Sequence, residues 1–562
     1  MLGYICKYTP VEAFVSMGVE MKRVEPDVTN FNQADMKMHP NICSFAKGVL
    51  EELMQEDHEG IILTTCCDSI RRLYDVLKEE FPEKFIYILD IPRITKEAGA
   101  VLYEKRIRAM MQAYEAYSGR QFREDRFREI LKTAQERERL SFKKKRLNIG
   151  ILGARANKNI KEILEERGAG VAFDLTCTGL DRKIIYQESE LYLAYTRGLL
   201  AQFPCMRMEQ ASNRDELIRR YSDSADGIIY HTVQFCDNYA YEYAWLKEWL
   251  QRPMLLLETD YTKQSFGQML TRIEAFLESL QPQQAGKEPL RSQPGKKERT
   301  GGQENMYVLG IDSGSTSTNA VIMDRDKKIR AFSVVRTGAK SGESADKVLK
   351  DVLEKASLQR EEIAWIVSTG YGRVSIPFAD ENVTEISCHG RGAHYFNPDV
   401  RTILDIGGQD SKAISLNQEG EVQDFVMNDK CAAGTGRFLE MIARTLEVSL
   451  DDLGAIALTS TEKIEITSMC SVFAESEVIS LIANNKEKAD IADGVCHAIA
   501  NKAYGLLSRV GLTPAFMMTG GVAKNPGVVR AVEEKIGGKL YICPEPEIVG
   551  AVGAALYALE QI

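Results

Sequence analysis

The sequence contains no uninterrupted apolar run that approaches the roughly 18 residues of a membrane-spanning helix. Its first residues, MLGYICKYTPVEAF, lack the basic flank and the long apolar core of a signal peptide. Clustered positive charge is also missing: the net charge is −10, whereas a nucleic-acid partner requires grouped Lys and Arg. We therefore expect a cytoplasmic protein that binds neither membrane nor nucleic acid, and we interpret the basic run FKKKRL as a solvated helix end.

Length and cysteine content limit the number of domains and the kind of cysteine chemistry that we expect. A chain of 562 residues exceeds what one core supports and predicts about three domains. Its 44% hydrophobic and 27% charged residues are ordinary for a globular protein, so the composition excludes a fibrous or disordered chain. Twelve cysteines in a large cytoplasmic chain indicate metal ligands or reduced thiols rather than a disulfide framework.

Strands alternate with helices in the N-terminal half, which predicts two parallel-sheet α/β domains of the flavodoxin or Rossmann type. GYICKY, GIILTTCCDS and KFIYILDIP are the strands of residues 1–95, and RLNIGILGA, GVAFDLTCTG, GIIYHTVQFCD and PMLLLETDY are those of residues 147–280. The charged segment 96–146 is a helical connector. GILGARANKN lacks the third glycine of a dinucleotide-binding loop, so we exclude that function. Functional loops of parallel sheets follow the strands, where Cys66 and Cys67 lie.

Residues 281–305 are rich in Gln, Pro, Gly and Lys and have almost nothing to bury, which predicts a flexible linker. Such a tether raises the effective concentration of one half of the chain for the other. We therefore expect the two halves to be functional partners.

The C-terminal half, residues 306–562, repeats an apolar strand followed by a glycine turn three times. Glycine turns let backbone N–H groups approach phosphates, and a carboxylate at a strand end is suited to hold a hydrated Mg²⁺. The pattern predicts a two-lobed, actin-like (ribonuclease H-like) ATPase in which Gln409 and Asp410 orient the attacking water. The predicted ATP and Mg²⁺ site contains Asp312, Gly314, Ser315, Thr316, Asp405, Gly407, Gly408, Gly520 and Gly521.

NDKCAAGTGRF and SMCSVFAESEVISLI, together with STGYGR and DIGGQDSK, resemble the ATPase activator components of 2-hydroxyacyl-CoA dehydratases and benzoyl-CoA reductases. The resemblance covers residues 306–562. It implies a [4Fe–4S] cluster shared by two subunits, with Cys431 and Cys470 as the ligands from each chain. Two thiolates cannot complete a four-thiolate site, so we expect a homodimer. The helix expected to start at Cys431 would transmit lobe movements to the cluster.

LTTCCDSIRRLYD, CTG, FPCMR, VQFCDNYAYEY and LLLETDYTKQSFGQMLTRIEAFLE resemble the iron–sulfur subunits of the same systems, over most of residues 1–280. The resemblance implies a cluster between the two α/β domains. Its ligands would be Cys43, Cys67 and Cys236, and the fourth iron position would stay open.

The sequence departs from that pattern because it contains four further thiols, those of Cys6, Cys66, Cys177 and Cys205. One branch of the family, the double-cubane cluster proteins, holds an [8Fe–9S] cluster with six cysteines, and six of the seven here could serve. Each further thiol could instead be a buried, inert one. That alternative is weaker for Cys177 and Cys205, which neighbour Gly and Pro turns.

We expect an ATP-driven electron-transfer enzyme. The C-terminal half would accept an electron from a donor such as ferredoxin or flavodoxin and pass it to the N-terminal cluster, which reduces a small molecule. One alternative is a 2-hydroxyacyl-CoA dehydratase component, acting on an acyl-CoA, with its activator fused to it. Another is a redox-sensing ATP switch. The paired cysteines disfavour a sugar or acyl kinase.

CHGRGAHYF in the C-terminal half contains Cys388, His389 and His394. Their spacing does not fit a zinc site, so we interpret this segment as a turn of the ATPase lobe. We interpret Cys496 and Cys543 as structural.

Overall fold

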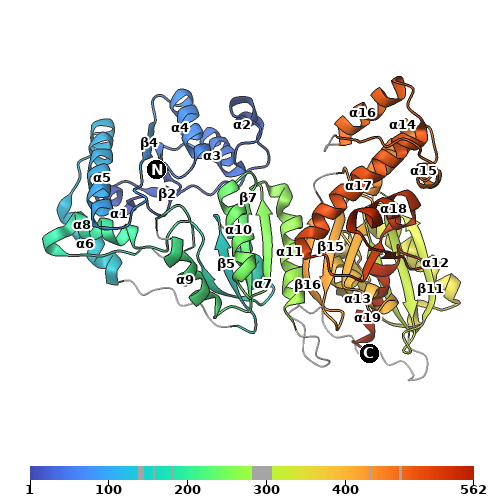
Figure 1. Ribbon diagram of the computed structural model, residues 1–562. Coiled ribbons are helices and arrows are strands. Elements are labelled where there is room, and N and C mark those ends of the chain that lie inside the picture. The colour runs from blue at the N-terminus through green and yellow to red at the C-terminus, as the bar shows by residue number, and fades with distance from the viewer. Residues whose placement is uncertain are drawn as a thin grey trace. The chain divides into compact units, whose positions relative to one another are not determined.

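The computed structural model describes residues 1–136, 145–155, 158–179, 183–209, 211–281, 307–338, 340–429, 432–467 and 471–562. It divides into two units, one that ends at Ile273 and one that starts at Glu274 (Figure 1). Residues 282–305 of the predicted linker lie outside the described residues. Of the helices described, none is both long and apolar enough to cross a bilayer.

The first sheet of the N-terminal unit is parallel, with the order β2-β1-β3-β4. Its strands are β1 (Leu2–Tyr4), β2 (Met21–Arg23), β3 (Gly60–Thr64) and β4 (Phe85–Leu89). The sequence analysis missed β2, because MKR is a short, half-buried edge strand without an apolar run. The helices are α1 (Val11–Ser16), α2 (Asn32–Lys37), α3 (Ser44–Gln55) and α4 (Asp68–Glu80).

Two helices follow this sheet, α5 (Glu97–Ser118) and α6 (Glu124–Glu136), as predicted for the charged connector. Gly119 ends α5 in the left-handed conformation, with φ of +71°. Residues 137–144 of the connector lie outside the described part of the chain.

The second sheet repeats the first, with the parallel order β6-β5-β7-β8. Its strands are β5 (Asn148–Gly153), β6 (Gly170–Asp174), β7 (Gly227–Val233) and β8 (Met254–Thr259). The helices are α7 (Lys158–Glu166), α8 (Leu191–Leu200), α9 (Ala211–Ser222), α10 (Asp237–Trp249) and α11 (Phe266–Ser279), with 3-10 turns η1 (Glu188–Glu190) and η2 (Lys263–Ser265).

In each sheet the first strand lies between the second and the third, so the chain changes direction there. Parallel sheets place their binding crevice at that point, beyond the carboxyl ends of the strands. A continuous core joins the two sheets, since Leu63 of β3 and Tyr230 of β7 belong to the same buried cluster. The fold thus predicts one site served by both crevices.

The C-terminal unit contains two sheets with the same topology, β11-β10-β9-β12-β13 and β16-β15-β14-β17-β18. In each, three antiparallel strands are followed by two parallel ones. This duplication gives the two lobes of the predicted actin-like fold. The strands of the first lobe are β9 (Tyr307–Ser313), β10 (Ser317–Met323), β11 (Ile329–Arg336), β12 (Ile363–Thr369) and β13 (Glu381–Asn382). Those of the second are β14 (Thr402–Ile406), β15 (Ser411–Leu416), β16 (Val422–Asn428), β17 (Phe516–Thr519) and β18 (Leu540–Tyr541).

Eight helices of this unit are described: α12 (Ser341–Ala356), α13 (Glu385–Phe396), α14 (Gly436–Thr445), α15 (Leu450–Ala457), α16 (Ser471–Ala483), α17 (Lys488–Val510), α18 (Pro526–Ile536) and α19 (Val549–Leu559). Single 3-10 turns are η3 (Arg360–Glu362), η4 (Arg373–Ser375) and η5 (Gly521–Lys524). Our interpretation of CHGRGAHYF as a turn is wrong, because it lies in α13. Glycines let α13 and α19 cross closely: a Cβ on Gly553 would lie 1.8 Å from the Cys388 carbonyl oxygen.

Candidate functional site

Three cysteines of the N-terminal unit occupy the N-cap positions of helices. Cys43 precedes α3, Cys67 precedes α4 and Cys236 precedes α10. A helix N-terminus favours a thiolate there, because its unpaired N–H groups carry partial positive charge. The Ser44 N–H donates to the Gln234 carbonyl at 3.2 Å, which holds the Cys43 and Cys236 loops together.

Three further cysteines of this unit lie in loops. Cys6 follows β1, Cys177 follows β6, and Cys205 lies in the loop after α8. The Tyr239 hydroxyl lies 3.0 Å from the sulfur of Cys177 and 3.9 Å from that of Cys205. The Cys205 N–H donates to the Tyr8 hydroxyl at 3.1 Å, which ties this loop to the Cys6 loop.

Burial and repulsion between neighbouring thiolates both raise the pKa values of these thiols. Burial raises the pKa of Cys6 to about 12, with Cys177 and Cys205 contributing. Burial also raises the pKa of Cys236 to about 12, and both Cys43 and Cys177 add to the effect. Cys236 therefore interacts with members of both groups. Thiols from the two crevices thus lie around one partly buried site, which would require a cation to hold them as thiolates.

The pKa values of the adjacent cysteines Cys66 and Cys67 shift in opposite directions. A side-chain hydrogen bond to Cys67 raises the pKa of Cys66, and the same bond lowers the pKa of Cys67. Cys67 is thus the better metal ligand of the two, and Cys66 is a hydrogen-bond donor beside it.

Cations that the sequence analysis did not single out surround the thiols. Lys7 is buried and donates to the Phe203 carbonyl at 2.6 Å. Arg155, which follows β5, donates to the Ile5 carbonyl just before Cys6, and to the Val24 carbonyl at 3.0 Å. No sequence pattern indicates that a single Lys or Arg in a loop will lie beside the thiols.

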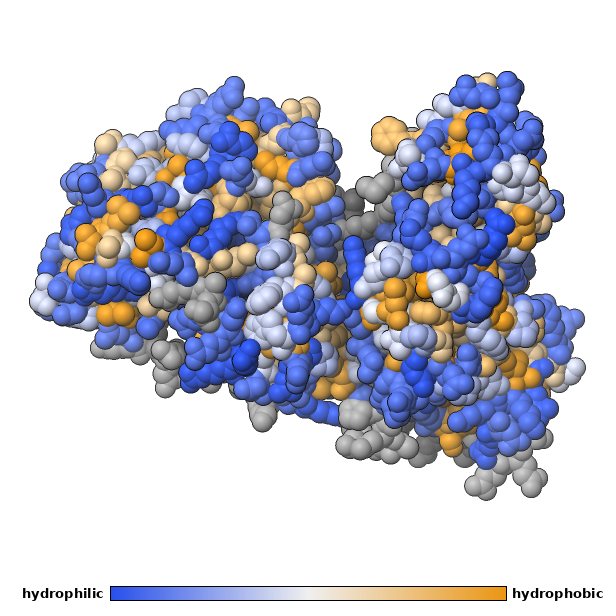
Figure 2. All heavy atoms as spheres, in the orientation of Figure 1, coloured by the Kyte–Doolittle hydropathy of each residue, from blue (hydrophilic) through white to orange (hydrophobic). Residues whose placement is uncertain are grey.

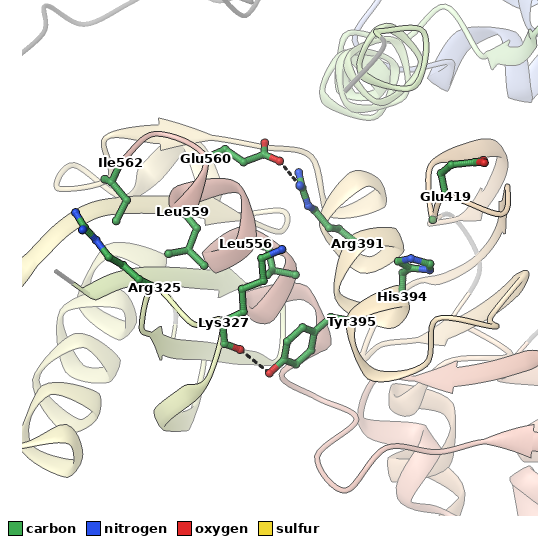
Figure 3. Close-up of a pocket in the computed structure, with 11 residues that line it drawn as sticks. Arg325, Lys327, Arg391, His394, Tyr395, Glu419, Leu556, Leu559, Glu560 and Ile562 are labelled. Atoms are coloured by element: carbon green, nitrogen blue, oxygen red, sulfur yellow. Dashed lines mark hydrogen bonds and ion pairs between the residues drawn. The ribbon is translucent and has the colours of Figure 1, made fainter. Parts of the chain in front are cut away.

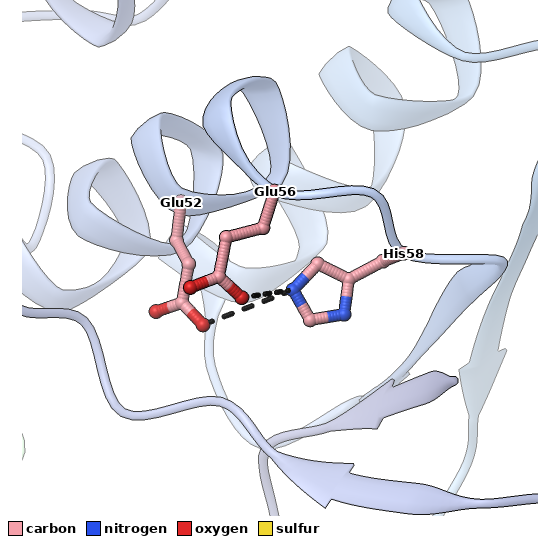
Figure 4. Close-up of side chains that lie close together, drawn as sticks. All are labelled: Glu52, Glu56 and His58. Atoms are coloured by element: carbon pink, nitrogen blue, oxygen red, sulfur yellow. Dashed lines mark ion pairs between the residues drawn. The ribbon is translucent and has the colours of Figure 1, made fainter.

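The spacing of the thiols is wider than a single metal ion requires. Within the described ranges, only Glu52, Glu56 and His58 bring three ligand atoms within 4.8 Å of one another (Figure 4). There Lys22 already neutralises Glu56, at 2.7 Å, so that group is an ion-pair network. Wider spacing and an all-thiol donor set fit an iron–sulfur cluster, whose thiolates attach to different irons.

The predicted nucleotide turns lie against each other in the C-terminal unit. Thr316, in the turn between β9 and β10, meets Gly408, in the turn between β14 and β15: a Cβ on Gly408 would lie 1.8 Å from the Thr316 hydroxyl oxygen. That buried oxygen has no hydrogen-bond partner in the described structure. Neighbouring Gly314 and Ser315 are half-buried in the same turn. An unpaired hydroxyl and an obligatory glycine fit a bound phosphate.

Asp405, at the end of β14, is buried in a charge network. Lys412 donates to its Oδ2 at 3.0 Å, the Thr519 hydroxyl donates to its Oδ1 at 2.8 Å, and His389 Nδ1 lies 3.5 Å from the same oxygen. His389 Nε2 lies 3.7 Å from Asp312 Oδ2. The two predicted Mg²⁺ carboxylates are therefore bridged by one imidazole.

The charged groups of this network shift one another's pKa values. Burial alone would raise the pKa of Asp405, but His389 and Lys412 hold it well below its usual range. Asp405 and Asp312 raise the pKa of His389 against the effect of burial. Burial raises the pKa of Glu385 to about 7, although Lys412 opposes the shift.

The remaining predicted residues line the same region. Gln409 is exposed in the second turn, and Asp410 pairs with Lys412 at 2.7 Å. Gly520 follows β17 with φ of +83°, and a Cβ there would lie 2.4 Å from the Ile406 carbonyl. Gly521 begins the turn η5. The third glycine turn thus packs directly on the second.

The nucleotide turn is bonded to the loop that precedes α14. The Gly436 N–H donates to the Gly407 carbonyl and the Arg437 N–H to the Gly408 carbonyl, both at 2.9 Å. The helix begins at Gly436 instead of the expected Cys431. Cys431 and Cys470 themselves lie outside the described residues.

The C-terminal unit also has a pocket of about 530 Å³, which lies near the carboxyl ends of α13 and α19 (Figure 3). Arg391 and His394 from α13 and Glu560 from the end of α19 line it. It contains none of the predicted site residues.

Sequence reasoning missed His389, Lys412 and Glu385 as parts of the nucleotide site. Lys412 stands in the DIGGQDSK motif that we noted, two residues after Asp410, so its alternation with Asp410 on the strand was an available signal. His389 and Glu385 are four residues apart on one helix face, which becomes visible only once α13 is recognised as a helix.

Comparisons with known proteins found a matching family model for each half of the chain. A family model described as the BadF/BadG/BcrA/BcrD ATPase family matches residues 309–558. One described as the 2-hydroxyglutaryl-CoA dehydratase D-component matches residues 6–147 and 137–280.

Three curated relatives are similar to the chain. The activator of lactoyl-CoA dehydratase from Anaerotignum propionicum is 48% identical, over 45% of this chain and 98% of that protein. The (R)-2-hydroxyglutaryl-CoA dehydratase activating ATPase from Acidaminococcus fermentans is 44% identical, over 46% and 98%. A benzoyl-CoA reductase subunit from Thauera aromatica is 32% identical, over 38% and 77%. The N-terminal half is thus similar to the 2-hydroxyglutaryl-CoA dehydratase D-component. The chain belongs to the BadF/BadG/BcrA/BcrD ATPase family.

Proposed function

We propose that the C-terminal ATPase uses ATP hydrolysis to deliver low-potential electrons to an iron–sulfur centre in the N-terminal half, which reduces a small molecule. One observation carries the proposal: thiols from both crevices of the N-terminal unit lie around one partly buried site, in a chain whose other half belongs to an ATPase family. A fused pair of this kind needs no separate encounter between donor and acceptor.

Two sets of three thiols would hold the N-terminal centre, as a double cubane. The N-cap thiols of Cys43, Cys67 and Cys236 form one set, and the loop thiols of Cys6, Cys177 and Cys205 form the other. A cluster bound there would supply one-electron chemistry at low potential. Tyr239 would donate its hydroxyl hydrogen to the loop set, since it lies beside two of those sulfurs. Arg155 would fix Cys6 by holding the carbonyl of the preceding residue.

In the nucleotide cleft, Asp312 and Asp405 would hold the Mg²⁺ of Mg·ATP. The unpaired Thr316 hydroxyl would donate to a phosphate oxygen, and exposed Gln409 would orient the attacking water. Hydrolysis would then shift the turn that contains Gly407 and Gly408. Because Gly436 and Arg437 are bonded to that turn, the shift would reach the loop that follows Cys431.

Cys431 and Cys470 would hold a [4Fe–4S] cluster between two copies of the chain, with ferredoxin or flavodoxin as its electron donor. α16 starts immediately after Cys470 and exposes Phe473, Ile479 and Ile482. In Figure 2 orange atoms interrupt the hydrophilic surface around α14 and α16, which lie at the top of this unit in Figure 1. Exposed apolar side chains beside a half-complete ligand set support a dimer interface there.

A second candidate is dehydration of a 2-hydroxyacyl-CoA, which the description of the N-terminal family model favours. Turnover of a 2-hydroxyacyl-CoA by the purified chain would support it. A redox-sensing ATP switch would show nucleotide-dependent reduction and no substrate turnover.

The test is iron and acid-labile sulfide per chain after anaerobic purification. Two cubanes in the N-terminal half and half of a shared cluster give about ten irons per chain. Cys177→Ser or Cys205→Ser should remove part of that iron. Cys496→Ser is the matched control, since Cys496 is fully buried in α17, and it should keep all of the iron at a cost of about 1 kcal/mol in packing. About six irons per chain, unchanged by Cys177→Ser and Cys205→Ser, would contradict the double cubane.

A further inference from the structure

A pocket of about 300 Å³ opens directly onto the thiol site. Its wall contains Cys66 and Cys67, and its rim contains three arginines, Arg71, Arg93 and Arg207. Neither the family descriptions nor the sequence motifs assign a role to this pocket.

The three guanidinium groups are not neutralised by the protein. No ion pair joins any of them to a carboxylate of the described residues, although Arg72, the next residue on α4, pairs with Asp75 at 3.0 Å. Asp68 is the one acidic side chain that lines the pocket. The pocket therefore has an excess of positive charge beside the sulfur atoms.

Two helices add to this potential. α4 begins at Asp68 and α10 at Asp237, and the pocket touches the first turn of each through Asp68 and Asn238. Both helices have 13 residues, long enough for their N-termini to favour a negative ligand. Arginine adds the planar, paired donors that match carboxylates and oxyanions.

We infer that this pocket is the substrate subsite and that it binds a small organic or inorganic anion through a carboxylate or oxyanion group. Its role as a substrate subsite rests on the proposed function, whereas anion binding itself does not. The volume is at the lower limit of ligand pockets, so it suits a small acid and does not enclose a coenzyme A moiety. Arg71 and Arg93 would hold the anion, and Arg207 would face the thiols.

The experiment measures binding by calorimetry on the full chain, purified anaerobically with its iron, while Mg·ADP saturates the nucleotide cleft. The probes are inorganic sulfate, lactate and coenzyme A. The test variant carries Arg71→Gln and Arg93→Gln, and Arg72→Gln is the control on the same helix. Sulfate and lactate should bind wild type and control alike, and the double variant at least about tenfold more weakly, as expected for lost charge-assisted hydrogen bonds. Added salt should weaken binding to wild type.

Two results would overturn the inference. One is equal binding of sulfate and lactate by wild type and by the double variant. The other is a dependence on Arg71 and Arg93 for coenzyme A alone, which would identify the occupant as the phosphate of an acyl-CoA. If the double variant does not fold, Arg71→Lys with Arg93→Lys replaces it and should retain part of the affinity. Iron is measured in the same preparations. Intact anion binding by a chain without iron would contradict the proposed function but not anion binding by this pocket.

Discussion

The two sites of this chain differ in how their charges are balanced. In the nucleotide cleft, Asp405 is buried against Lys412, His389 and Thr519, so each charge already has an opposite one. At the thiol site, burial raises the pKa values of Cys6 and Cys236 to about 12, and the charge of Arg207 offsets only part of the rise at Cys236. The charged groups of the cleft are balanced by one another, whereas the thiol site would be balanced by the proposed metal cluster.

This difference teaches where the stability of each site comes from. Buried ion pairs order the cleft without a ligand, and the proposed Mg·ATP would then enter a preformed site. At the thiol site the pKa values of five cysteines are raised, so a bound cluster that holds them as thiolates would contribute its binding free energy to the stability of the N-terminal unit. The following predictions test that contrast.

Removing iron should have the largest effect, and it should act on one unit only. Anaerobic chelation should lower the melting transition of the N-terminal unit by on the order of 10 °C, since several kcal/mol of metal binding are lost. The transition of the C-terminal unit should stay where it is. Differential scanning calorimetry measures both, and added Mg·ADP identifies the C-terminal transition by raising it. A shift of both transitions, or of neither, would contradict the contrast.

Removing Lys412 should break the balance of the cleft. Lys412→Met leaves the buried carboxylates of Asp405 and Glu385 without their cation, which costs about 3–5 kcal/mol of unfolding free energy. Lys524→Met is the control, because Lys524 is half-exposed and its pair with Glu547 is worth at most about 1 kcal/mol. Urea denaturation of the two variants makes the comparison. Equal losses would show that the network of Lys412 does not stabilise the cleft.

The sequence predicts the strands of both sites well, because each is a continuous apolar run followed by glycine or cysteine. It therefore places Asp312, Asp405 and four of the thiols, those of Cys6, Cys67, Cys177 and Cys236, at or just after strand ends. Cys43 and Cys205 follow helices instead. What it does not predict comes from contacts between distant segments. Arg155 reaches the Cys6 loop, and His389 lies between two lobes, and neither contact has a local pattern.

Two errors have local physical causes. The segment CHGRGAHYF suggests a turn because its two glycines have low helix propensity, yet Gly392 is required by the close crossing with α19. The helix near Cys431 starts five residues later than expected, because Thr435 rather than the cysteine is its N-cap. Tertiary packing decides both cases.

Changing one of the proposed Mg²⁺ carboxylates should separate ATP hydrolysis in the cleft from cluster binding by the thiols. Asp312→Asn should lower ATP hydrolysis by at least about a hundredfold, the order expected when a charge-stabilising group at the phosphates is lost, while iron content stays at the wild-type value. The control is Asp324→Asn, since Asp324 is equally buried in the same lobe but pairs with Arg330 away from the nucleotide turns. Phosphate release and iron assays decide the outcome. Wild-type hydrolysis by Asp312→Asn would remove Asp312 from the cleft.

The smallest effect should come from Gln409, which the cleft does not need for its structure. Gln409 is exposed, so Gln409→Ala should leave the melting temperature and the affinity for ATP unchanged. A residue that orients water acts mainly in the transition state, so kcat should fall roughly tenfold, equivalent to about 1.4 kcal/mol. Gln418→Ala is the matched control, because Gln418 is exposed in the turn between β15 and β16, at the other end of the same strand. Steady-state hydrolysis and nucleotide binding are measured for both variants. A fall in affinity in place of kcat would show that Gln409 binds the nucleotide, and a fall in neither would assign the positioning of water to Asp410, which Lys412 already holds in the cleft.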